Sequence, residues 1–271
     1  EGDVVGGVKE GDVAEGMAAG VDDVEAGLAE HDMVAVDDRR FIVLERRARL
    51  LRITMNRPDS MNAFNLELHN ELPEALAFAR SDTGSDVIML TGAGRAFSAG
   101  GDIAHIERNA ANPELFDHEV EMAKAIIFTL LDIDKPVVCR MNGHAVGLGA
   151  TLALFCDVIF AADTAKIGDP HVGLGLVAGD GGAVIWPQLI GFARAKELLM
   201  TGDLLTATEA AGMGLINYAV PTDQLDAKVA DIAQKILANP RWAVRWTKTV
   251  ANIALKQIAV STSDAAVAYE M

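Results

Sequence analysis

The sequence predicts an α/β fold that ends in a helical region, and three observations lead to this prediction. Short apolar segments alternate with longer segments of helical periodicity over the first two hundred residues. Glycine-rich turns follow two of the apolar segments, and beyond Gly181 helical patterns follow one another. Alternation of strands and helices is typical of a sheet covered by helices, and the apolar content of 51% is ample for its core.

The first 38 residues differ from the rest of the chain in charge. They carry twelve acidic residues and one basic residue, Lys9, and so contribute −11 to the formal net charge of −16. An unbalanced run of this kind is typically solvated. We therefore expect an acidic N-terminal extension over residues 1–38, a core domain over 39–200 and a helical region over 201–271.

A β-hairpin is the first predicted element of the core. Its strands are the apolar segments 41–44 and 50–55, and the loop Arg57-Pro58-Asp59-Ser60 follows them. Leucines at helical spacing from Asn65 to Arg80 predict a helix. The next segment, Val87-Ile88-Met89-Leu90, is wholly apolar and predicts a buried strand.

The same alternation continues through the second half of the core. A long helix is expected over 113–132 and a buried strand over 136–139. The glycine-rich turn 142–149 leads into an apolar helix, and 158–161 is a further strand. The remaining helices are expected near 182–200, 207–213, 222–238 and 241–257.

Composition argues against several classes of function. A net charge of −16 disfavours binding to nucleic-acid phosphates. The longest apolar stretch, 145–162, is interrupted by glycines and Asp157, so no membrane span is expected. Cys139 and Cys156 have no metal-site spacing, and no secretory leader is recognised at the start of the sequence. We expect a cytoplasmic protein that holds no metal.

Two glycine-rich loops share one construction. The strand 87–90 leads through Gly92 and Gly94 into Ala99-Gly100-Gly101-Asp102, and a helix is expected from Ile103. The strand 136–139 leads into Gly147-Leu148-Gly149, and a helix is expected from Ala150. Backbone N–H groups are unbonded at the N-terminus of a helix. Two such groups that face one point would bind an oxyanion.

These loops, in the segments 96–102 and 142–149, resemble the crotonase (enoyl-CoA hydratase/isomerase) superfamily, and the resemblance covers about residues 40–257. Cys156-Asp157, Asn56-Arg57-Pro58, Asn62-Ala63-Phe64 and Trp246-Thr247-Lys248 also match. The resemblance implies a crotonase-like spiral of ββα units whose C-terminal helices serve in trimerisation, giving a homotrimer or a dimer of trimers. It also implies an acyl-CoA substrate from fatty acid metabolism and no cofactor beyond that coenzyme A.

The resemblance further implies that the thioester oxygen accepts hydrogen bonds from the N–H groups of Ala99 and Leu148, which stabilises an enolate. Leu148 stands where the family commonly has glycine. The coenzyme A site would include a second set of residues: Ala63, Ala99, Gly100, Gly101 and Asp102. Asp102 is also expected to cap the helix that follows. Lys248 is either a partner of the coenzyme A phosphates or a residue of a solvated helix face.

The proton-transferring residues depart from the family pattern. Family hydratases carry two glutamates, and the matching positions here are Thr151 and His171. Thr151 is no general base at neutral pH, which leaves it a packing role or the orientation of a water; His171 titrates in the useful range. Asp180, nine residues after His171, is either a helix N-cap or an active-site carboxylate. We therefore expect weak turnover of crotonyl-CoA.

Two alternatives to a hydratase/isomerase remain open. The segments 168–171 and 178–181 also resemble the 6-oxocamphor hydrolase branch of the superfamily, which cleaves a C–C bond in β-diketones. That resemblance would unite His171, Asp180 and His69, the last of which could equally lie on the polar face of its helix. The second alternative is a protein that binds acyl-CoA without catalysis.

Overall fold

The structure is a computed structural model that describes residues 34–35, 39–111 and 116–270. Within these residues, seven strands form a large sheet in the order β1-β2-β3-β4-β6-β8-β11. Their bounds are β1 Val34–Ala35, β2 Ile42–Arg47, β3 Leu50–Met55, β4 Val87–Gly92, β6 Val137–Met141, β8 Val158–Ala162 and β11 Tyr218–Val220. The predicted hairpin and the three buried strands after it are confirmed. Of the predicted extension, only Val34–Ala35 is described, as β1 paired with β2; the rest of it lies outside the described residues.

Strand direction changes once across this sheet. β2 and β3 pair antiparallel, with Leu44 opposite Ile53, whereas β3, β4, β6, β8 and β11 are parallel. Every residue of β4 is buried, as expected of a strand covered on both faces. The parallel strands therefore share one carboxyl edge, where their exit loops meet.

A second sheet of four short strands, in the order β10-β9-β7-β5, lies within the described residues and was not predicted. Its strands are β5 Ala96–Ser98, β7 His144–Val146, β9 Lys166–Gly168 and β10 Leu205–Thr206. Each has two or three residues, too few to show an apolar period. β5, β7 and β9 are parallel. This small sheet sets the two glycine-rich loops side by side.

The helices agree with the predicted order and differ at some ends. Their bounds are α2 Leu66–Ser81, α3 Ile103–Ala111, α4 Phe116–Asp132, α5 Leu148–Leu154, α6 Gly182–Thr201, α7 Ala207–Gly212, α8 Leu225–Leu237 and α9 Arg241–Glu270. α5 begins at Leu148, two residues before the expected Ala150, and α9 continues thirteen residues beyond 257. Short 3₁₀ turns complete the chain at Pro58–Ser60, His171–Leu174 and Thr222–Gln224.

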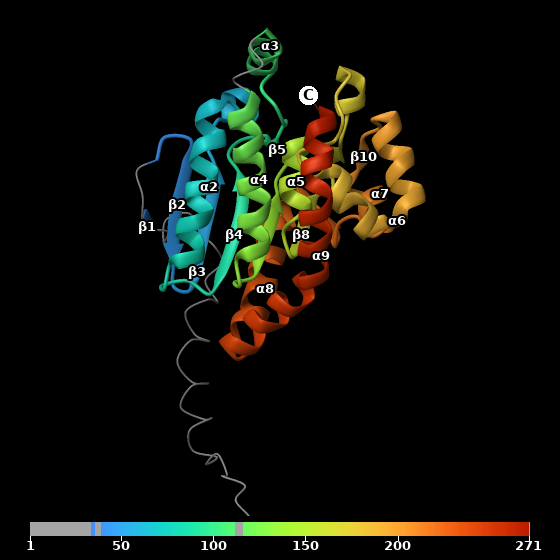
Figure 1. The fold of residues 1–271 in the computed structure, drawn as a ribbon. Helices are drawn as coiled ribbons and strands as arrows, with labels where there is room; N and C mark the ends of the chain where they lie inside the picture. The colour runs from blue at the N-terminus through green and yellow to red at the C-terminus, as the bar shows by residue number, and fades with distance from the viewer. Residues whose placement is uncertain (1–33, 36–38, 112–115, 271) are drawn as a thin grey trace, which may run out of the picture.

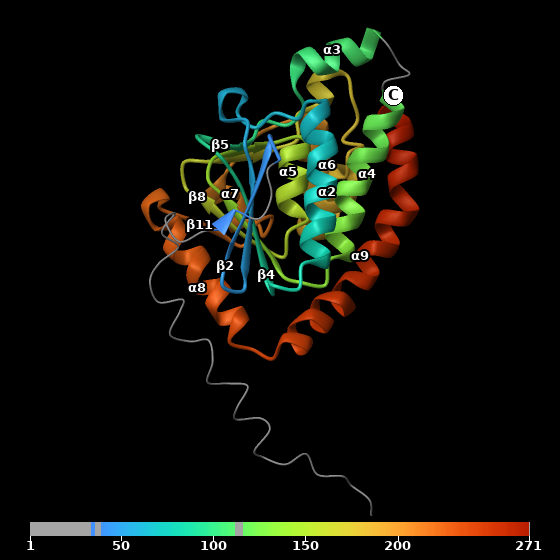
Figure 2. The same cartoon turned by 90° about the vertical axis from the view of Figure 1, so that its left-hand side faces the viewer.

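The helices cover the large sheet on both faces. α2, α4 and α9 lie side by side on one face, and α8 packs on the other against β4, β6 and β8 (Figures 1 and 2). The inward face of α2 consists of Leu68, Leu72 and Leu76, which are fully buried. This spacing of four residues is the helical period seen in the sequence. Together these elements form a mixed α/β fold with a helical C-terminal region, as predicted.

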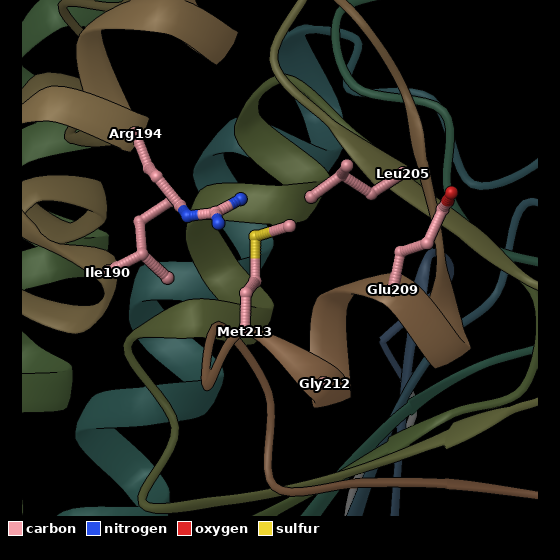
Figure 3. A pocket seen from close by; sticks show the side chains of 6 residues that line it. All are labelled: Ile190, Arg194, Leu205, Glu209, Gly212 and Met213. Atoms are coloured by element: carbon pink, nitrogen blue, oxygen red, sulfur yellow. The ribbon is translucent and has the colours of Figure 1, made fainter.

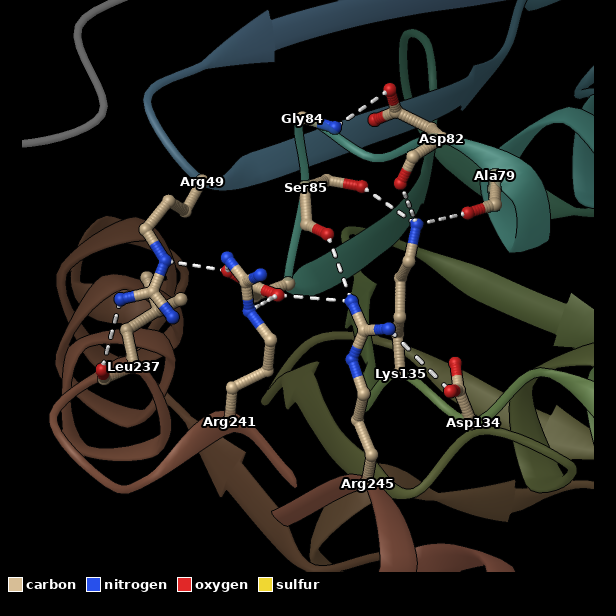
Figure 4. Close-up of polar contacts among 11 residues, drawn as sticks. Arg49, Ala79, Asp82, Gly84, Ser85, Asp134, Lys135, Leu237, Arg241 and Arg245 are labelled. Carbon is tan, nitrogen blue, oxygen red and sulfur yellow. Dashed lines mark hydrogen bonds and ion pairs between the residues drawn. The ribbon is translucent and has the colours of Figure 1, made fainter. Parts of the chain in front are cut away.

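A polar network fastens α9 to the amino edge of the parallel strands (Figure 4). The Nε atoms of Arg49 and Arg241 each lie 2.6 Å from a carboxylate oxygen of Asp86, and Nη2 of Arg245 lies 2.9 Å from Asp86 Oδ1. Burial alone would raise the pKa of Asp86, but hydrogen bonds and charge from Arg49 and Arg241 give a net lowering. Asp86 thus stays ionised and holds three arginines from two distant segments, the β2–β3 turn and the start of α9.

Lys248 belongs to the packing of α9, which corrects both interpretations of this residue. It is 8% exposed, and its Nζ lies 2.7 Å from Asp157 Oδ2 and 3.0 Å from the Lys135 carbonyl oxygen. It is therefore neither solvated nor directed at a phosphate. Burial raises the pKa of Asp157, and the Lys248 charge opposes that rise.

Candidate active site

The first glycine-rich loop, after β4, is held by two asparagine side chains. Asn62 is fully buried, and its Nδ2 donates to the carbonyl oxygens of Ala96 at 2.9 Å and Phe97 at 3.1 Å. Asn142 accepts from the Gly92 N–H at 3.1 Å and donates to the Gly94 carbonyl at 2.9 Å. Each side-chain amide thus forms hydrogen bonds with backbone groups of the segment from Gly92 to Phe97. These contacts fix the path of β5 and of the loop that follows it.

The two glycine-rich loops contact each other directly. β5 and β7 are neighbouring parallel strands, so the chain leaves both at the same edge. A Cβ on Gly100, whose φ is +82°, would lie 2.6 Å from the Val146 carbonyl oxygen. Gly147 has a φ of +53° and is the N-cap of α5. Both positions therefore require glycine, one for close approach and both for a left-handed backbone.

The first backbone donor differs from the one predicted. The Ala99 N–H donates to the Met61 carbonyl oxygen at 2.9 Å and is therefore occupied. The Gly100 N–H donates to Ser98 Oγ at 3.2 Å. Among the described residues, the N–H groups of Gly101 and Leu148 donate to no acceptor. Gly101 replaces Ala99 as the available donor of the first loop, whereas Leu148 is available as predicted.

The residues predicted to bind coenzyme A lie together. The Phe64 N–H donates to the Gly100 carbonyl at 2.7 Å, and the Asp102 N–H donates back to the Phe64 carbonyl at 3.0 Å. This bridge sets Ala63 beside the 99–102 segment. Arg57 donates to the Ala63 carbonyl oxygen and lies 3.2 Å from Asp102 Oδ2. The carboxylate of Asp102 is thus paired with Arg57, a contact that the expected capping role did not include.

His171, Asp180 and Thr151 form one chain of polar contacts, which a fourth residue, Asp169, extends. His171 Nδ1 bonds to Asp169 Oδ1, and His171 Nε2 lies 3.6 Å from Asp180 Oδ2. The Thr151 hydroxyl donates to Asp180 Oδ1 at 3.2 Å. His171 and Asp169 follow β9, Thr151 lies in α5, and Asp180 precedes α6. The structure therefore brings together three of the residues predicted from three separate segments.

This chain of residues lies against the second loop. A Cβ on Gly147 would be 3.2 Å from His171 Cε1 and 3.4 Å from Nε2, so the ring edge contacts the residue before Leu148. Thr151 is in the first turn of the same helix, and its N–H donates to the Gly147 carbonyl at 2.9 Å. The imidazole thus lies beside Gly147, the residue that precedes Leu148 at the start of α5.

Asp180 carries a perturbed carboxyl group. Burial raises the pKa of Asp180 to about 6, with the His171 charge opposing and the Asp169 charge adding to the rise. The N-cap of α6 is Gly181, one residue later, so capping is not the whole role of Asp180. A carboxyl group that titrates near neutral pH beside an imidazole can both take up and release a proton under physiological conditions.

His69 packs beside Phe64 and His105. It is 7% exposed, its Nδ1–H donates to the Asn65 carbonyl at 3.0 Å, and its ring is 5.2 Å from Phe64 and 6.0 Å from His105. The polar-face interpretation is therefore wrong, because the side chain is buried. These contacts do not join His69 to His171 and Asp180, and the trio of the hydrolase branch stays a prediction.

The same cluster has the spacing of a cation site. Asp169, His171 and Asp180 each offer an atom within 4.8 Å of the others. His171 Nδ1 is already hydrogen-bonded to Asp169, however, and its Nε2 faces a carboxyl group of raised pKa. Both ring nitrogens of His171 thus face carboxyl groups of the cluster itself.

A surface hollow of about 470 Å³ lies between α6, β10 and α7. Figure 3 shows the Arg194 and Met213 side chains directed into it. Its lining consists of Ile190, Arg194, Leu205, Glu209, Gly212 and Met213. None of the predicted site residues belongs to this lining, so we assign no part of the reaction to the hollow.

Residues 45–270 match the family model described as enoyl-CoA hydratase/isomerase. The chain belongs to this family. A crotonyl-CoA hydratase from Syntrophomonas wolfei is 38% identical over 213 residues, which cover 78% of this chain and 81% of the relative. The 1,2-epoxyphenylacetyl-CoA isomerase of Escherichia coli is 33% identical over 216 residues, covering 79% and 82%.

A solved structure shows the same fold. The crystal structure of an enoyl-CoA hydratase/isomerase from Mycobacterium paratuberculosis is 37% identical, covers 86% of this chain and 94% of its own, and aligns with a TM-score of 0.82. The crotonase fold and an enzyme of the hydratase/isomerase type are therefore confirmed. Within the part of the chain that the structure describes, no helix has the length and apolarity to cross a membrane.

Sequence reasoning did not include Asp169 in the site, and it placed Gly101 in the coenzyme A set rather than among the backbone donors; both residues stand inside motifs that drew attention to the site. Asp169 is two residues before His171, at a spacing that allows a local side-chain contact. Gly101 follows Gly100 in the first loop, and only the Met61 contact of Ala99 decides which N–H is available. The first could have been found from spacing, and the second required coordinates.

Proposed function

We propose that this family member moves a proton between carbon atoms of an enoyl-CoA thioester. In this proposal the N–H groups of Gly101 and Leu148 hold the thioester oxygen, and the His171–Asp180 pair carries the proton. The observation that supports it most strongly is the position of His171, whose ring edge packs on Gly147, next to the Leu148 donor. Acid–base group and oxyanion donor are then adjacent, as enolate chemistry requires.

Isomerisation needs one acid–base centre, whereas hydration needs two. A C2–H bond of a 3-enoyl-CoA breaks, its proton passes to the His171–Asp180 pair, and the electron pair delocalises onto the thioester oxygen. The same proton returns to C4, which leaves a 2-enoyl-CoA with no other reactant consumed. Hydration by the family route would require a second carboxylate, but that position is Thr151, whose hydroxyl is bonded to Asp180.

An acyl-CoA substrate is supported by the Ala63 and Gly100–Asp102 segments, which the bridge at Phe64 and Gly101 joins. The relatives are named for crotonyl-CoA and 1,2-epoxyphenylacetyl-CoA, both thioesters of coenzyme A. Proton transfer by a positioned side chain typically contributes about 10²–10⁴-fold to a rate. The two N–H donors are expected to contribute about 10²–10³-fold for each group removed.

The test compares two reactions in the wild-type protein and in His171→Ala. The formation of 2-hexenoyl-CoA from 3-hexenoyl-CoA should exceed the hydration of crotonyl-CoA in kcat/KM, and His171→Ala should lose at least about 10²-fold in the first reaction. Asp231→Asn, an exposed change on α8, is the control that should leave the rate unchanged. Crotonyl-CoA hydration at the rate of glutamate-bearing hydratases, or full activity in His171→Ala, would contradict the proposal.

C–C bond hydrolysis is a second candidate, favoured by the chain from Thr151 through Asp180 to His171. A hydroxyl donor and an acid–base pair could orient and deprotonate a water that attacks a β-carbonyl carbon. The proton taken from the water would then return to the departing enolate. Release of a carboxylate from a cyclic β-diketone, lost in both His171→Ala and Asp180→Asn, would support it; no release from any β-dicarbonyl compound would exclude it.

We propose a homotrimer, or a dimer of trimers, as the assembly. α9 exposes a stripe of large apolar side chains at intervals of four, four, three and seven residues, which places them on one helix face: Trp242, Trp246, Val250, Ile253 and Val260. Trp246 is 63% exposed, and a stripe of this length is typical of a surface that a second copy covers. Sedimentation should give a trimer or hexamer, and Trp246→Glu should shift it toward monomer, whereas Lys235→Glu should not.

A further inference from the structure

We propose that Asp169 is a positioning residue that fixes the tautomer of His171 and so makes Nε2 the nitrogen that exchanges the proton. This inference rests on the proposed function and assigns a role to a residue that the family resemblance does not include. The inference is based on the contact between Asp169 and His171 Nδ1, on the burial of that contact, and on the position of the other ring nitrogen, Nε2, beside Asp180.

The contact determines which nitrogen carries hydrogen. Asp169 Oδ1 accepts from His171 Nδ1, and the backbone N–H of His171 lies 3.4 Å from the same oxygen. A carboxylate oxygen accepts hydrogen bonds, so an imidazole that is neutral and keeps this contact carries its hydrogen on Nδ1. The lone pair is then on Nε2, which is 3.6 Å from Asp180 Oδ2 and packs beside Gly147.

The surroundings hold Asp169 in this orientation. Its side chain has no exposed surface, and a Cβ on Gly182 would lie 2.3 Å from Asp169 Oδ2. The carboxylate is therefore enclosed between the 3₁₀ turn of His171 and the first residue of α6. In the described part of the chain, Oδ2 is buried and has no hydrogen-bond partner.

This arrangement costs stability and is best explained by a role in the reaction. A buried carboxylate oxygen without a partner is unfavourable and therefore calls for an explanation. When Nε2 takes a proton, the ring becomes an imidazolium, and Asp169 supplies the adjacent negative charge that stabilises it. When Nε2 releases the proton, the same contact returns the ring to the Nδ1–H form.

The experiment reads the tautomer and the rate separately. The full-length protein, labelled with ¹⁵N-histidine, would be compared with Asp169→Asn, which keeps the shape of the side chain and removes its charge. Wild-type His171 should show a protonated Nδ1 and an unprotonated Nε2. Asp169→Asn should shift His171 toward the Nε2–H form and lower kcat on the order of 10²-fold, with KM changed less than about threefold. Asp157→Asn, which changes a partly exposed carboxylate paired with Lys248, should leave the His171 shifts unchanged.

Each result decides a different point. An Nε2–H tautomer in the wild-type protein, or unchanged shifts and kcat in Asp169→Asn, would overturn the role of Asp169 even if His171→Ala is inactive. A tautomer shift in Asp169→Asn together with full activity in His171→Ala would instead confirm the contact and reject the proposed function. If Asp169→Asn does not fold, the wild-type tautomer still decides the inference.

Discussion

Two buried carboxylate clusters at opposite ends of the parallel strands show how one residue type is put to different uses. Asp86 stands directly before β4 and is surrounded by Arg49, Arg241 and Arg245. Asp180 belongs to the site at the other end, where a single imidazole separates it from a second carboxylate, Asp169. Cations outnumber carboxylates in the first cluster, and carboxylates outnumber the imidazole in the second.

The difference in charge balance has opposite consequences for the two carboxyl groups. The arginines lower the pKa of Asp86 despite its burial, so its proton is absent throughout the physiological range. Burial raises the pKa of Asp180 to about 6, so its proton is exchangeable there. A surplus of arginines keeps a buried carboxylate ionised as a structural anchor, whereas burial that one imidazole offsets only in part leaves a carboxyl group that exchanges its proton near neutral pH.

The largest expected effect concerns activity. Asp180→Asn should lower kcat for enoyl-CoA isomerisation by about 10²–10⁴-fold, because the amide cannot exchange a proton with His171. Steady-state kinetics on the purified variant would measure this, with Asp231→Asn as the exposed control. An equally large kcat loss in Asp86→Asn, measured on folded protein, would contradict the assignment of a structural role to Asp86 and of proton transfer to Asp180.

The next effect is a dependence of stability on pH. Asp180 has a folded-state pKa of about 6 against a model value of 3.8, so its stabilising contribution is present below pH 3.8 and is lost as pH rises through 6. A difference of this size corresponds to about 3 kcal/mol. Urea unfolding should show the stability of wild type relative to Asp180→Asn falling as pH rises from about 4 to 7. A constant difference over this range would contradict the raised pKa.

Asp86 should show the opposite sign. Its pKa is lowered in the folded state, so its contribution is present above pH 3.8 and is lost as pH falls below that value. At neutral pH, Asp86→Asn should reduce the free energy of unfolding by about 2–3 kcal/mol. This value is at or below the lower end of the usual stability loss for breaking a buried ion pair, because the Arg49 and Arg241 side chains are 39% and 44% exposed. A neutral effect would show that α9 does not depend on this anchor.

The smallest effect concerns Thr151. Thr151→Val removes the hydroxyl that donates to Asp180 Oδ1 at 3.2 Å, a contact that lowers the pKa of Asp180. The loss of one such bond is worth about 1 kcal/mol, so kcat should fall less than about tenfold. Any limb of the pH–rate profile set by Asp180 should move to higher pH. A limb of the pH–rate profile that moves to lower pH would show that the Thr151 hydroxyl does not lower the pKa of Asp180.

The sequence was sufficient to predict the elements that bury apolar residues. The hairpin, β4 and α2 follow from alternation, an apolar run and leucines at helical spacing. The grouping of Thr151, His171 and Asp180 followed from the family resemblance and is present in the structure. By contrast, the small sheet could not be predicted, because β5, β7 and β9 have three residues each and are defined by tertiary pairing.

The remaining misses have the same physical origin. Which loop N–H is available depends on the Met61 carbonyl, a contact between segments nearly forty residues apart. The burial of His69 depends on Phe64 and on α3, which its own helix pattern does not show. The sequence pattern allows Lys248 to be a surface residue, whereas the structure packs α9 so that Lys248 contacts Asp157 and the Lys135 carbonyl. Local periodicity carries no information about such contacts.

The most direct measurement is a crystal structure with a bound, unreactive acyl-CoA analogue. The thioester oxygen should lie about 2.7–3.1 Å from the backbone nitrogens of both Gly101 and Leu148, with His171 Nε2 facing the α-carbon. A thioester oxygen bound to any other pair of donors, or an α-carbon turned away from His171 and Asp180, would contradict the account.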